Sequence, residues 1–458
     1  MFKNSWIQRA SVSTASLLQL PAAAIHGRIT DVSGLTVTVG GLTGLATVGD
    51  RLTLEDRDGH AIAAEVIGFR GGLARAMPFA ALDRIGPGHE ARLDTVARGT
   101  LAVSDAWLGR VIDPLGRALD GRGPLPNGPT PRPVRASPPD AAGRARLGPP
   151  LDLGVLALNC FTTCRQGQRL GLFAGSGIGK STLLAMMARH TACDAVVLAL
   201  AGERGREVRE FLEDELGPDG LARSVVVVAT SDTAPLQRRQ AAYTAMTVAE
   251  HFRDQGLSVL FLMDSVTRFC LALREIGLSA GEPPATRGYP PSVFAELPRL
   301  LERAGPGPVL PDGKAGQITA LFTVLVEGDD HNEPVADAVR GILDGHVILD
   351  RRIAEAGRYP AVDVLRSLSR AASGCLTSEQ AALLRRARSV IALHQDMADL
   401  VRLGAYRAGT DPAGDEALAL VPRIDAILRQ TPDEYRGLED SFTLLRDAMD
   451  GPRETHHG

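Results

Sequence analysis

The feature that most constrains the fold of this chain is a glycine-rich loop, Ala174-Gly-Ser-Gly-Ile-Gly-Lys-Ser-Thr182. A short apolar run, Gly171 to Phe173, precedes it, and a helix-length segment, Ser181 to His190, follows. Because glycine permits positive φ, several backbone N–H groups can turn inward and form a nest for an anion. The N-terminus of the following helix adds partial positive charge there. The strand, loop and helix together predict a nucleotide phosphate site.

The loop departs from the strict phosphate-loop pattern in one place, because Ala174 stands where that pattern has glycine. The alternative interpretation is a glycine-rich surface turn, which the strand before, the helix after and the Gly-Lys-Ser triplet all disfavour. Lys180 is expected to reach the β- and γ-phosphates and Ser181 to hold Mg²⁺. The candidate ATP-binding residues of the loop are Gly175, Ser176, Gly177, Ile178, Gly179, Lys180, Ser181 and Thr182.

Two carboxylates at the ends of apolar runs are candidates for the remaining chemistry. Asp264 ends the run that begins at Val259, as expected of a residue that supports Mg²⁺ beside a phosphate loop. Glu203 follows the run Ala195 to Leu200 and could polarise the attacking water. The surroundings of Glu203 are charged, so its pattern alone fits the solvated start of a helix nearly as well.

Continuous apolar or β-branched runs separated by helix-length segments predict a mostly parallel sheet covered on both faces. The segment from Pro114 to Pro150 is rich in Pro, Gly and Arg and is expected to be irregular. The runs are Gly171 to Phe173, Ala195 to Leu200, Val225 to Ala229, Ser258 to Met263 and Thr319 to Val326, and helices are expected at Ser181 to His190 and Gln240 to Arg253.

The two ends of the chain differ from this central pattern. Near the N-terminus, Leu35, Val37 and Val39 alternate with threonines, and short strands with glycine turns predict a small barrel or sandwich. Beyond Thr377 apolar residues recur at helical spacing, which predicts a helical bundle. We expect an N-terminal arm at 1–25, a β-barrel at 26–97, a P-loop ATPase domain at 98–376 and a helical domain at 377–458.

Composition excludes several classes of protein. With 458 residues, 44% of them hydrophobic, and a net charge of −4, the chain is neither disordered nor a general nucleic-acid or membrane-surface binder. Five cysteines do not form a disulfide framework, and buried reduced thiols are favoured over a metal site. No apolar run is long enough to span a bilayer, so the cytoplasm is the expected location. Only three of the 50 basic residues are lysines: Lys3, Lys180 and Lys314.

The phosphate loop resembles that of the type III export ATPases, relatives of the catalytic subunits of F- and V-type rotary ATPases. Several longer motifs resemble the same family, and the similarity extends from about residue 26 to about residue 445. These motifs are Asp264-Ser-Val-Thr-Arg-Phe269, Gly281-Glu-Pro-Pro-Ala-Thr-Arg-Gly-Tyr-Pro-Pro-Ser-Val-Phe294, Val324-Leu-Val-Glu-Gly-Asp-Asp330, Ile342-Leu-Asp-Gly-His346, Gly357-Arg-Tyr-Pro-Ala-Val-Asp363 and Ser367-Leu-Ser-Arg370.

The resemblance implies a P-loop (RecA-like) α/β ATPase core with a small N-terminal β-barrel and a C-terminal α-helical domain. It assigns Glu203 as the water-activating glutamate, Tyr359 as an aromatic that stacks on adenine, and Arg370 as an arginine finger supplied across a subunit interface. Without the motifs, Tyr359 would be a turn aromatic shielding the core and Arg370 one more surface arginine. The implied substrate is ATP with Mg²⁺.

The resemblance also implies a role and partners. The segments Leu158 to Gly167 and Leu403 to Pro412 favour the flagellar branch over the virulence-secretion branch. A homo-hexamer is expected, with the N-terminal arm binding a regulatory stator protein and the C-terminal domain facing chaperones and export substrates. The chain would act at the inner membrane, in peripheral contact with a membrane-embedded export gate.

Three other functions remain open at this point. A rotary ATP synthase subunit would need a partner chain and a shaft. An RNA-translocating ring ATPase also has an N-terminal β domain, but this one leans acidic, with seven Arg against nine Asp and Glu between His26 and Thr95. A nucleotide-binding scaffold without chemistry would have no use for Glu203.

Overall fold

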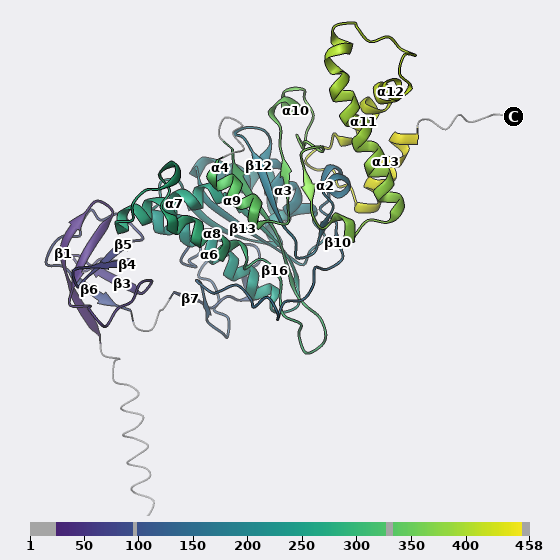
Figure 1. Cartoon of the computed structure of the whole chain (residues 1–458). Coiled ribbons are helices and arrows are strands. Elements are labelled where there is room, and N and C mark those ends of the chain that lie inside the picture. The colour runs from purple at the N-terminus through teal and green to yellow at the C-terminus, as the bar shows by residue number, and fades with distance from the viewer. Residues whose placement is uncertain (1–23, 95–98, 327–332, 451–458) are drawn as a thin grey trace, which may run out of the picture. The chain divides into compact units, whose positions relative to one another are not determined.

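The computed structural model describes residues 24–94, 99–326 and 333–450, and the chain divides into two compact units, Met1–Gly99 and Thr100–Gly458 (Figure 1). The expected N-terminal arm, residues 1–25, lies almost entirely outside the described residues. No helix in the described part of the chain has both the length and the apolar character needed to cross a membrane.

The first unit is a closed six-stranded barrel in the order β1-β2-β5-β4-β3-β6. Alternation decides its interior, since Leu52 and Leu54 of β3 are fully buried between partly exposed neighbours. Leu35, expected in the strand, lies instead in the hairpin turn before β2 and is 46% exposed. The strands are β1 Ile25–Ser33, β2 Thr36–Gly40, β3 Arg51–Glu55, β4 Ala61–Arg70, β5 Leu73–Pro78 and β6 Glu90–Leu93.

The second unit is built on a nine-stranded sheet in the order β19-β18-β12-β17-β15-β13-β14-β8, with β16 paired to β17. The seven strands from β18 to β8 along this order run parallel, which the continuous apolar runs predicted. The strands are β8 Arg110–Ile112, β12 Arg169–Ala174, β13 Ala195–Glu203, β14 Ser224–Thr230, β15 Ser258–Asp264, β16 Gly305–Pro306, β17 Gln317–Leu325, β18 Gly345–Ile348 and β19 Leu368–Ser369.

Side chains alternate between the two faces of this sheet, and each face has its own hydrophobic core. On one face Leu170 and Leu172 of β12 pack with α3 and the C-terminal helices, whereas Phe173 points to the core formed with α6 to α9. The helices of the core are α2 Leu156–Phe161, α3 Lys180–His190, α4 Gly205–Glu210, the π-helix η2 Phe211–Leu216, α5 Gly217–Ala222, α6 Pro235–Arg253, α7 Val266–Ala280, α8 Pro291–Leu301, α9 Pro334–Ile342 and α10 Arg351–Glu355.

Three helices close the described chain: α11 Ser378–Arg402, α12 Pro412–Leu428 and α13 Leu438–Asp450 (Figure 1). Thr377 caps α11, because its side chain accepts from the N–H of Gln380 while the Gln380 side chain accepts from the N–H of Thr377. Short paired strands and turns connect the larger elements: β7 Thr100–Leu101, η1 Asp105–Trp107, β9 Arg132–Pro133, β10 Pro150–Leu151, β11 Cys164–Arg165, η3 Thr286–Gly288 and η5 Ala372–Gly374. The predicted combination of barrel, α/β core and helical end is confirmed.

Candidate active site

The glycine-rich loop leaves the end of β12 and enters α3 at Lys180. Gly177 and Gly179 have φ of 75° and 84°, in the left-handed region that favours glycine. Gly179 is the N-cap of α3 and offers no side chain to its free N–H groups, which leaves them available to an anion. Ile178 is buried and anchors the loop in the core, whereas Ser176 and Gly177 are exposed.

Lys180 and Asp264 meet beside this loop although 84 residues separate them. Lys180 Nζ lies 2.5 Å and 2.6 Å from the two carboxylate oxygens of Asp264, at the end of β15. Thr323 of the neighbouring strand β17 donates from Oγ1 to Asp264 Oδ1 at 2.9 Å. The parallel sheet brings these groups together, because the carboxyl ends of parallel strands share one edge.

Glu203, at the end of β13, faces the same place. Its Oε1 lies 3.6 Å from Lys180 Nζ and accepts no hydrogen bond from any residue that the structure describes. Burial raises the pKa of this carboxyl, and the negative charge of Asp264 raises it further, while Lys180 opposes both. Glu203, Asp264 and Ser181 line one small pocket together with apolar Leu200 and Phe211. The carboxyl is therefore not the solvated helix start that its sequence pattern also allowed.

Tyr359 lies beside the loop, next to Gly179, and is 47% exposed. A Cβ added to Gly179 would be 3.3 Å from Tyr359 Cδ1, so the ring packs directly against the loop backbone. Arg351 donates to the carbonyl of Ser176 at 3.1 Å, and the N–H of Gln430 donates to the carbonyl of Tyr359 at 2.9 Å. The aromatic is thus fixed by its backbone and has exposed ring surface for a planar group.

Arg370 lies away from these residues. It follows β19, and its N–H donates at 2.9 Å to the carbonyl of Asp344, just before β18. Asp344 in turn bonds the start of β12, at Arg169. The phosphate loop leaves the other end of β12, at Ala174. At ~3.3 Å per residue, the two ends of this strand are about 16 Å apart. Arg370 is exposed and does not join the cluster around Lys180 in its own chain.

Comparisons with known proteins match nearly the whole chain. The ATP synthase alpha/beta family nucleotide-binding domain matches residues 154–369, and the T3SS EscN ATPase C-terminal domain matches residues 376–447. A flagellum-specific ATP synthase of Caulobacter vibrioides is 54% identical over 94% of this chain and 97% of its own length. The chain belongs to the type III export ATPases.

Two further similarities bear on this family. A type 3 secretion system ATPase of Xanthomonas euvesicatoria is 46% identical, covering 95% of this chain and 96% of its own. The assembled ATPase EscN of enteropathogenic E. coli, solved in complex with its central stalk EscO, matches with a TM-score of 0.83 and 39% identity. That match covers 92% of this chain and 100% of the solved one. The expectation of an ATPase is confirmed at the level of the family.

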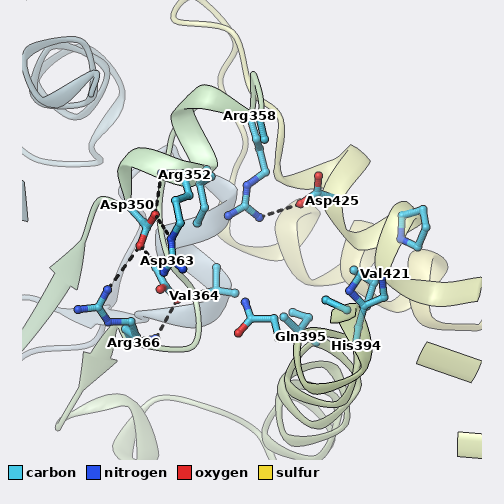
Figure 2. Close-up of a pocket in the computed structure, with 15 residues that line it drawn as sticks. Asp350, Arg352, Arg358, Asp363, Val364, Arg366, His394, Gln395, Val421 and Asp425 are labelled. Atoms are coloured by element: carbon cyan, nitrogen blue, oxygen red, sulfur yellow. Dashed lines mark hydrogen bonds and ion pairs between the residues drawn. The ribbon is translucent and has the colours of Figure 1, made fainter. Parts of the chain in front are cut away.

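This type III export ATPase has a second pocket, of about 740 Å³, between residues 350–366 and the helices α11 and α12 (Figure 2). Charged pairs line it: Arg358 donates to Asp425 of α12 at 3.0 Å, and Arg366 lies 3.5 Å from Asp350. Arg351 and Tyr359 belong to the same segment as Arg358, so the Arg358–Asp425 pair joins the helical domain to the segment that borders the phosphate loop.

Some residues around the export ATPase site escaped sequence reasoning. Thr323 lies inside a continuous apolar strand, and its contact with Asp264 depends on the strand order β12-β17-β15, which no local pattern encodes. Arg268, whose positive charge opposes the rise that burial causes in the pKa of Glu203, lies in the motif Asp264-Ser-Val-Thr-Arg-Phe269, so its position could have drawn attention. Arg351 precedes Tyr359 in a charged segment with no distinctive spacing.

Proposed function

We propose that this chain hydrolyses ATP at sites shared between identical subunits and that hydrolysis drives protein export by a flagellar type III apparatus. One observation carries this proposal. Lys180, Glu203 and Asp264 gather at the phosphate loop, while Arg370 lies at the opposite end of β12. An arginine at that end can meet a nucleotide only in the site of a neighbouring subunit.

The loop residues 175–182 would bind the phosphates of ATP. Their backbone N–H groups and the N-terminus of α3 complement negative charge, and Lys180 would exchange its contact with Asp264 for the β- and γ-phosphates. Tyr359 would stack on adenine, since it presents exposed ring surface beside Gly179. The aromatic and the anion nest together fit a nucleoside triphosphate.

The residues present also fit Mg²⁺. A hydroxyl and two carboxylates, from Ser181, Asp264 and Glu203, line one small pocket, and oxygen ligands of this kind suit that ion. Ser181 and Asp264 are the residues that would hold it, with the hydroxyl of Thr323 fixing the Asp264 carboxylate. The ion would supply positive charge that offsets the negative charge developing on the phosphates.

Glu203 would orient and polarise the attacking water. Its carboxylate is half-buried and only 3.6 Å from the ammonium of Lys180, so it is held at the edge of the phosphate site. The γ-phosphoryl group would transfer to this water, with ADP as the leaving group. Arg370 of the neighbouring subunit would neutralise charge on the transferring group, which can increase the rate by about 10³–10⁵.

Family membership supports a proposal for the assembly and its surroundings. EscN is solved assembled and with a central stalk, so we propose a ring, taken as a hexamer, that contacts a stalk-like partner. We retain the division at residues 1–25, 26–97, 98–376 and 377–458 as functional domains. The arm would bind a regulatory stator protein, the helical domain would face chaperones and substrates, and the ring would sit in the cytoplasm against the export gate at the inner membrane.

We propose the flagellar rather than the virulence role. Relatives with both kinds of name match this chain over most of its length. Two observations support the flagellar branch: the sequences of the segments Leu158 to Gly167 and Leu403 to Pro412, and the 54% identity to a flagellum-specific relative. Restoration of motility in a flagellar ATPase deletion strain tests this choice, and restoration of virulence secretion alone would overturn it.

Glu203→Gln tests the proposed chemistry. The amide keeps the size and position of the side chain but cannot accept a proton, so kcat should fall by about 10²–10⁴ while ATP affinity stays within a few-fold. Steady-state phosphate release and binding of a fluorescent ATP analogue measure the two effects.

Glu207→Gln is the matched control for this variant. Glu207 lines the same pocket but is exposed and pairs with Arg204 at 3.2 Å. Its amide variant should keep near-normal turnover. Normal kcat in Glu203→Gln, or an equal loss in both variants, would overturn the assignment of Glu203.

A further inference from the structure

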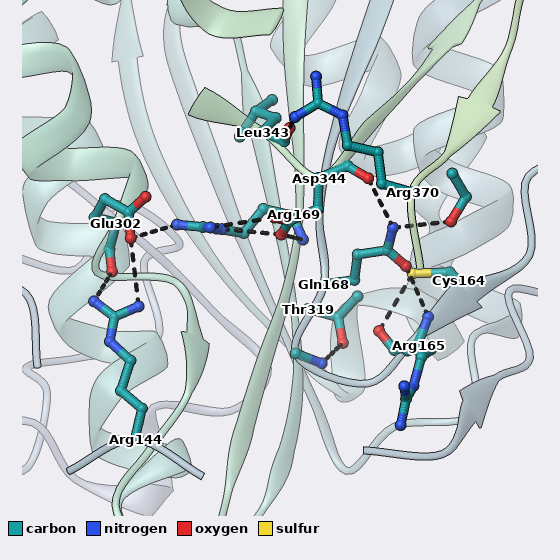
Figure 3. A network of polar contacts seen from close by, with 12 residues as sticks. Arg144, Cys164, Arg165, Gln168, Arg169, Glu302, Thr319, Leu343, Asp344 and Arg370 are labelled. Atoms are coloured by element: carbon teal, nitrogen blue, oxygen red, sulfur yellow. Dashed lines mark hydrogen bonds and ion pairs between the residues drawn. The ribbon is translucent and has the colours of Figure 1, made fainter. Parts of the chain in front are cut away.

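A buried glutamine joins the start of β12 to the residue that precedes Arg370 (Figure 3). Gln168 is fully buried, and its Nε2 donates to Ser369 Oγ at 2.9 Å and to the carbonyl of Asp344 at 3.2 Å. Its Oε1 accepts from the N–H of Arg165 at 3.0 Å. Both amide donors are used, and the carbonyl and N–H partners fix which way the amide points. Such a fully bonded buried amide specifies one arrangement of the segments that it joins.

Asp344 also contacts the segment that contains Arg370. Its carbonyl accepts both from Gln168 and from the N–H of Arg370. Its carboxylate accepts from Arg169, at 3.1 Å from the backbone N–H and 3.1 Å from Nε, and Arg169 also pairs with Glu302 at 2.6 Å. The N–H of Arg370 and the side chain of the preceding Ser369 are therefore both tied to residues around the start of β12.

The guanidinium of Arg370 is held much less firmly than its backbone. It donates to the carbonyl of Leu343 at 3.2 Å and, at the long distance of 3.5 Å, to that of Arg340 near the end of α9. The side chain is exposed. A long arginine side chain loses considerable rotamer freedom when it is ordered. The position of this guanidinium therefore depends on the backbone from which the side chain projects.

We propose that Gln168 and Asp344 are positioning residues that hold Arg370 in the orientation required at the nucleotide of the neighbouring subunit. This inference rests on the proposed trans role of Arg370. A displacement of about 1 Å in a group that contacts the transition state can cost about 10²-fold in rate. Neither residue would touch nucleotide, so each acts on a site in a different subunit from its own.

Two variants weaken the anchor to different degrees. Gln168→Glu keeps an oxygen for the Arg165 N–H but places the other oxygen against the Asp344 carbonyl, so kcat should fall about 10–100-fold with KM for ATP nearly unchanged. Ser369→Ala removes one hydrogen bond beside Arg370 and should lower kcat by less, about 3–10-fold, while perturbing the fold little.

Ser224→Ala is the matched control for Ser369→Ala. It removes another buried hydroxyl, which lies at the start of β14 and donates to the carbonyl of Gly220 at 2.6 Å. The loss of a buried hydrogen bond is comparable, but no candidate active-site residue lies next to it. Ser224→Ala should keep the kcat of the unaltered protein, even if its thermal stability falls as much as that of Ser369→Ala.

Mixed assemblies separate positioning from general damage. Lys180→Ala subunits have a disabled phosphate loop but an intact Arg370 anchor. Gln168→Glu and Ser369→Ala subunits have an intact phosphate loop but a weakened anchor. If the anchor acts on the neighbour, adding excess Lys180→Ala subunits should raise the ATPase rate per Gln168→Glu subunit at least about threefold. The same addition should bring the rate per Ser369→Ala subunit close to that of the unaltered protein. The same addition to unaltered protein should not raise its rate.

Three outcomes would overturn the inference. These are normal kcat in folded, assembled Gln168→Glu and Ser369→Ala, a loss in Ser224→Ala equal to that in Ser369→Ala, or a loss that Lys180→Ala subunits do not rescue. A mixture of Arg370→Ala and Lys180→Ala subunits, assayed in parallel, serves as the reference for the shared site. Rescue of Arg370→Ala without rescue of Ser369→Ala rejects the anchor and keeps the shared site, whereas failure to rescue Arg370→Ala rejects the shared site itself.

Discussion

At the scale of residues, one lysine among many arginines lies in the proposed phosphate site. The chain uses only three lysines among 50 basic residues, and Lys180 contacts Asp264 at 2.5 Å and Glu203 at 3.6 Å. A compact ammonium fits between these two carboxylates and the loop backbone, whereas a planar guanidinium with five donors would crowd them. Arginine therefore does not replace lysine at this position.

Lys180→Arg should lower kcat/KM for ATP by at least about 10²-fold, because the larger head group displaces the loop or the phosphates. Lys314→Arg is the matched control, since Lys314 is exposed in a surface loop and its variant should keep full activity. Phosphate release under saturating and limiting ATP measures both. Retained turnover in Lys180→Arg would show that the size and shape of the guanidinium do not exclude arginine from this position.

Sequence reasoning placed the phosphate loop and Asp264 because each follows a continuous apolar strand, and strand ends in a parallel sheet converge. It left Glu203 open, since a charged neighbourhood does not distinguish a half-buried carboxylate from a solvated one. It could not find Thr323 or Gln168. Their partners lie 59 and 201 residues away in sequence, and only the sheet order brings them together.

At the scale of elements, a buried ion pair joins α6 to the end of α8. Arg303 is fully buried and donates to both carboxylate oxygens of Glu250, at 2.9 Å and 2.6 Å. It also donates to the carbonyl of Val134 at 2.7 Å and to Thr247 Oγ1 at 3.0 Å. Removal of the arginine would therefore leave the buried carboxylate of Glu250 without its counter-charge, and the oxygens of Val134 and Thr247 without this donor.

Arg303→Ala should lower the free energy of unfolding by about 3–5 kcal/mol. The exposed pair of Arg206 and Glu210 provides the comparison, since Arg206→Ala breaks an ion pair on a solvated helix and should leave the unfolding midpoint unchanged. Urea unfolding followed by circular dichroism measures both variants. Equal midpoints for the two would show that the buried pair does not stabilise the α6–α8 contact.

Elements were predicted well where burial is continuous and less well where it is not. The five apolar runs all became strands of the central sheet. The helix expected from Gln240 instead begins at Pro235, where proline occupies the first turn and needs no hydrogen-bond partner for its nitrogen. Leu35 fitted the alternation of β2 but lies in the hairpin turn, because Gly34 adopts φ of 56° just before it.

At the scale of the whole molecule, one chain contains the two halves of the proposed site, and these halves do not meet. The phosphate loop, Glu203 and Asp264 lie at one end of the strands, and Arg370 lies at the other. Identical subunits that pack head to tail bring the two halves together and generate a ring if the rotation closes. Catalysis should therefore depend on assembly.

ATPase activity per subunit should rise with protein concentration and level off once the assembly is complete. ATP binding to the phosphate loop should change much less over the same range, since its candidate residues all come from one chain. Turnover and analogue binding measured across a dilution series, with particle size from light scattering, test this. A constant specific activity from fully dissociated to fully assembled protein would show that a single subunit is sufficient.

The most direct test of the shared site is an equimolar mixture of Lys180→Ala and Arg370→Ala subunits. Each variant alone should be nearly inactive, the first for lack of a working phosphate loop and the second for lack of a finger. In mixed rings, an intact loop of one variant meets an intact Arg370 of the other. The account predicts that the mixture hydrolyses ATP well above the mean of the two separate variants, and a rate equal to that mean would contradict it.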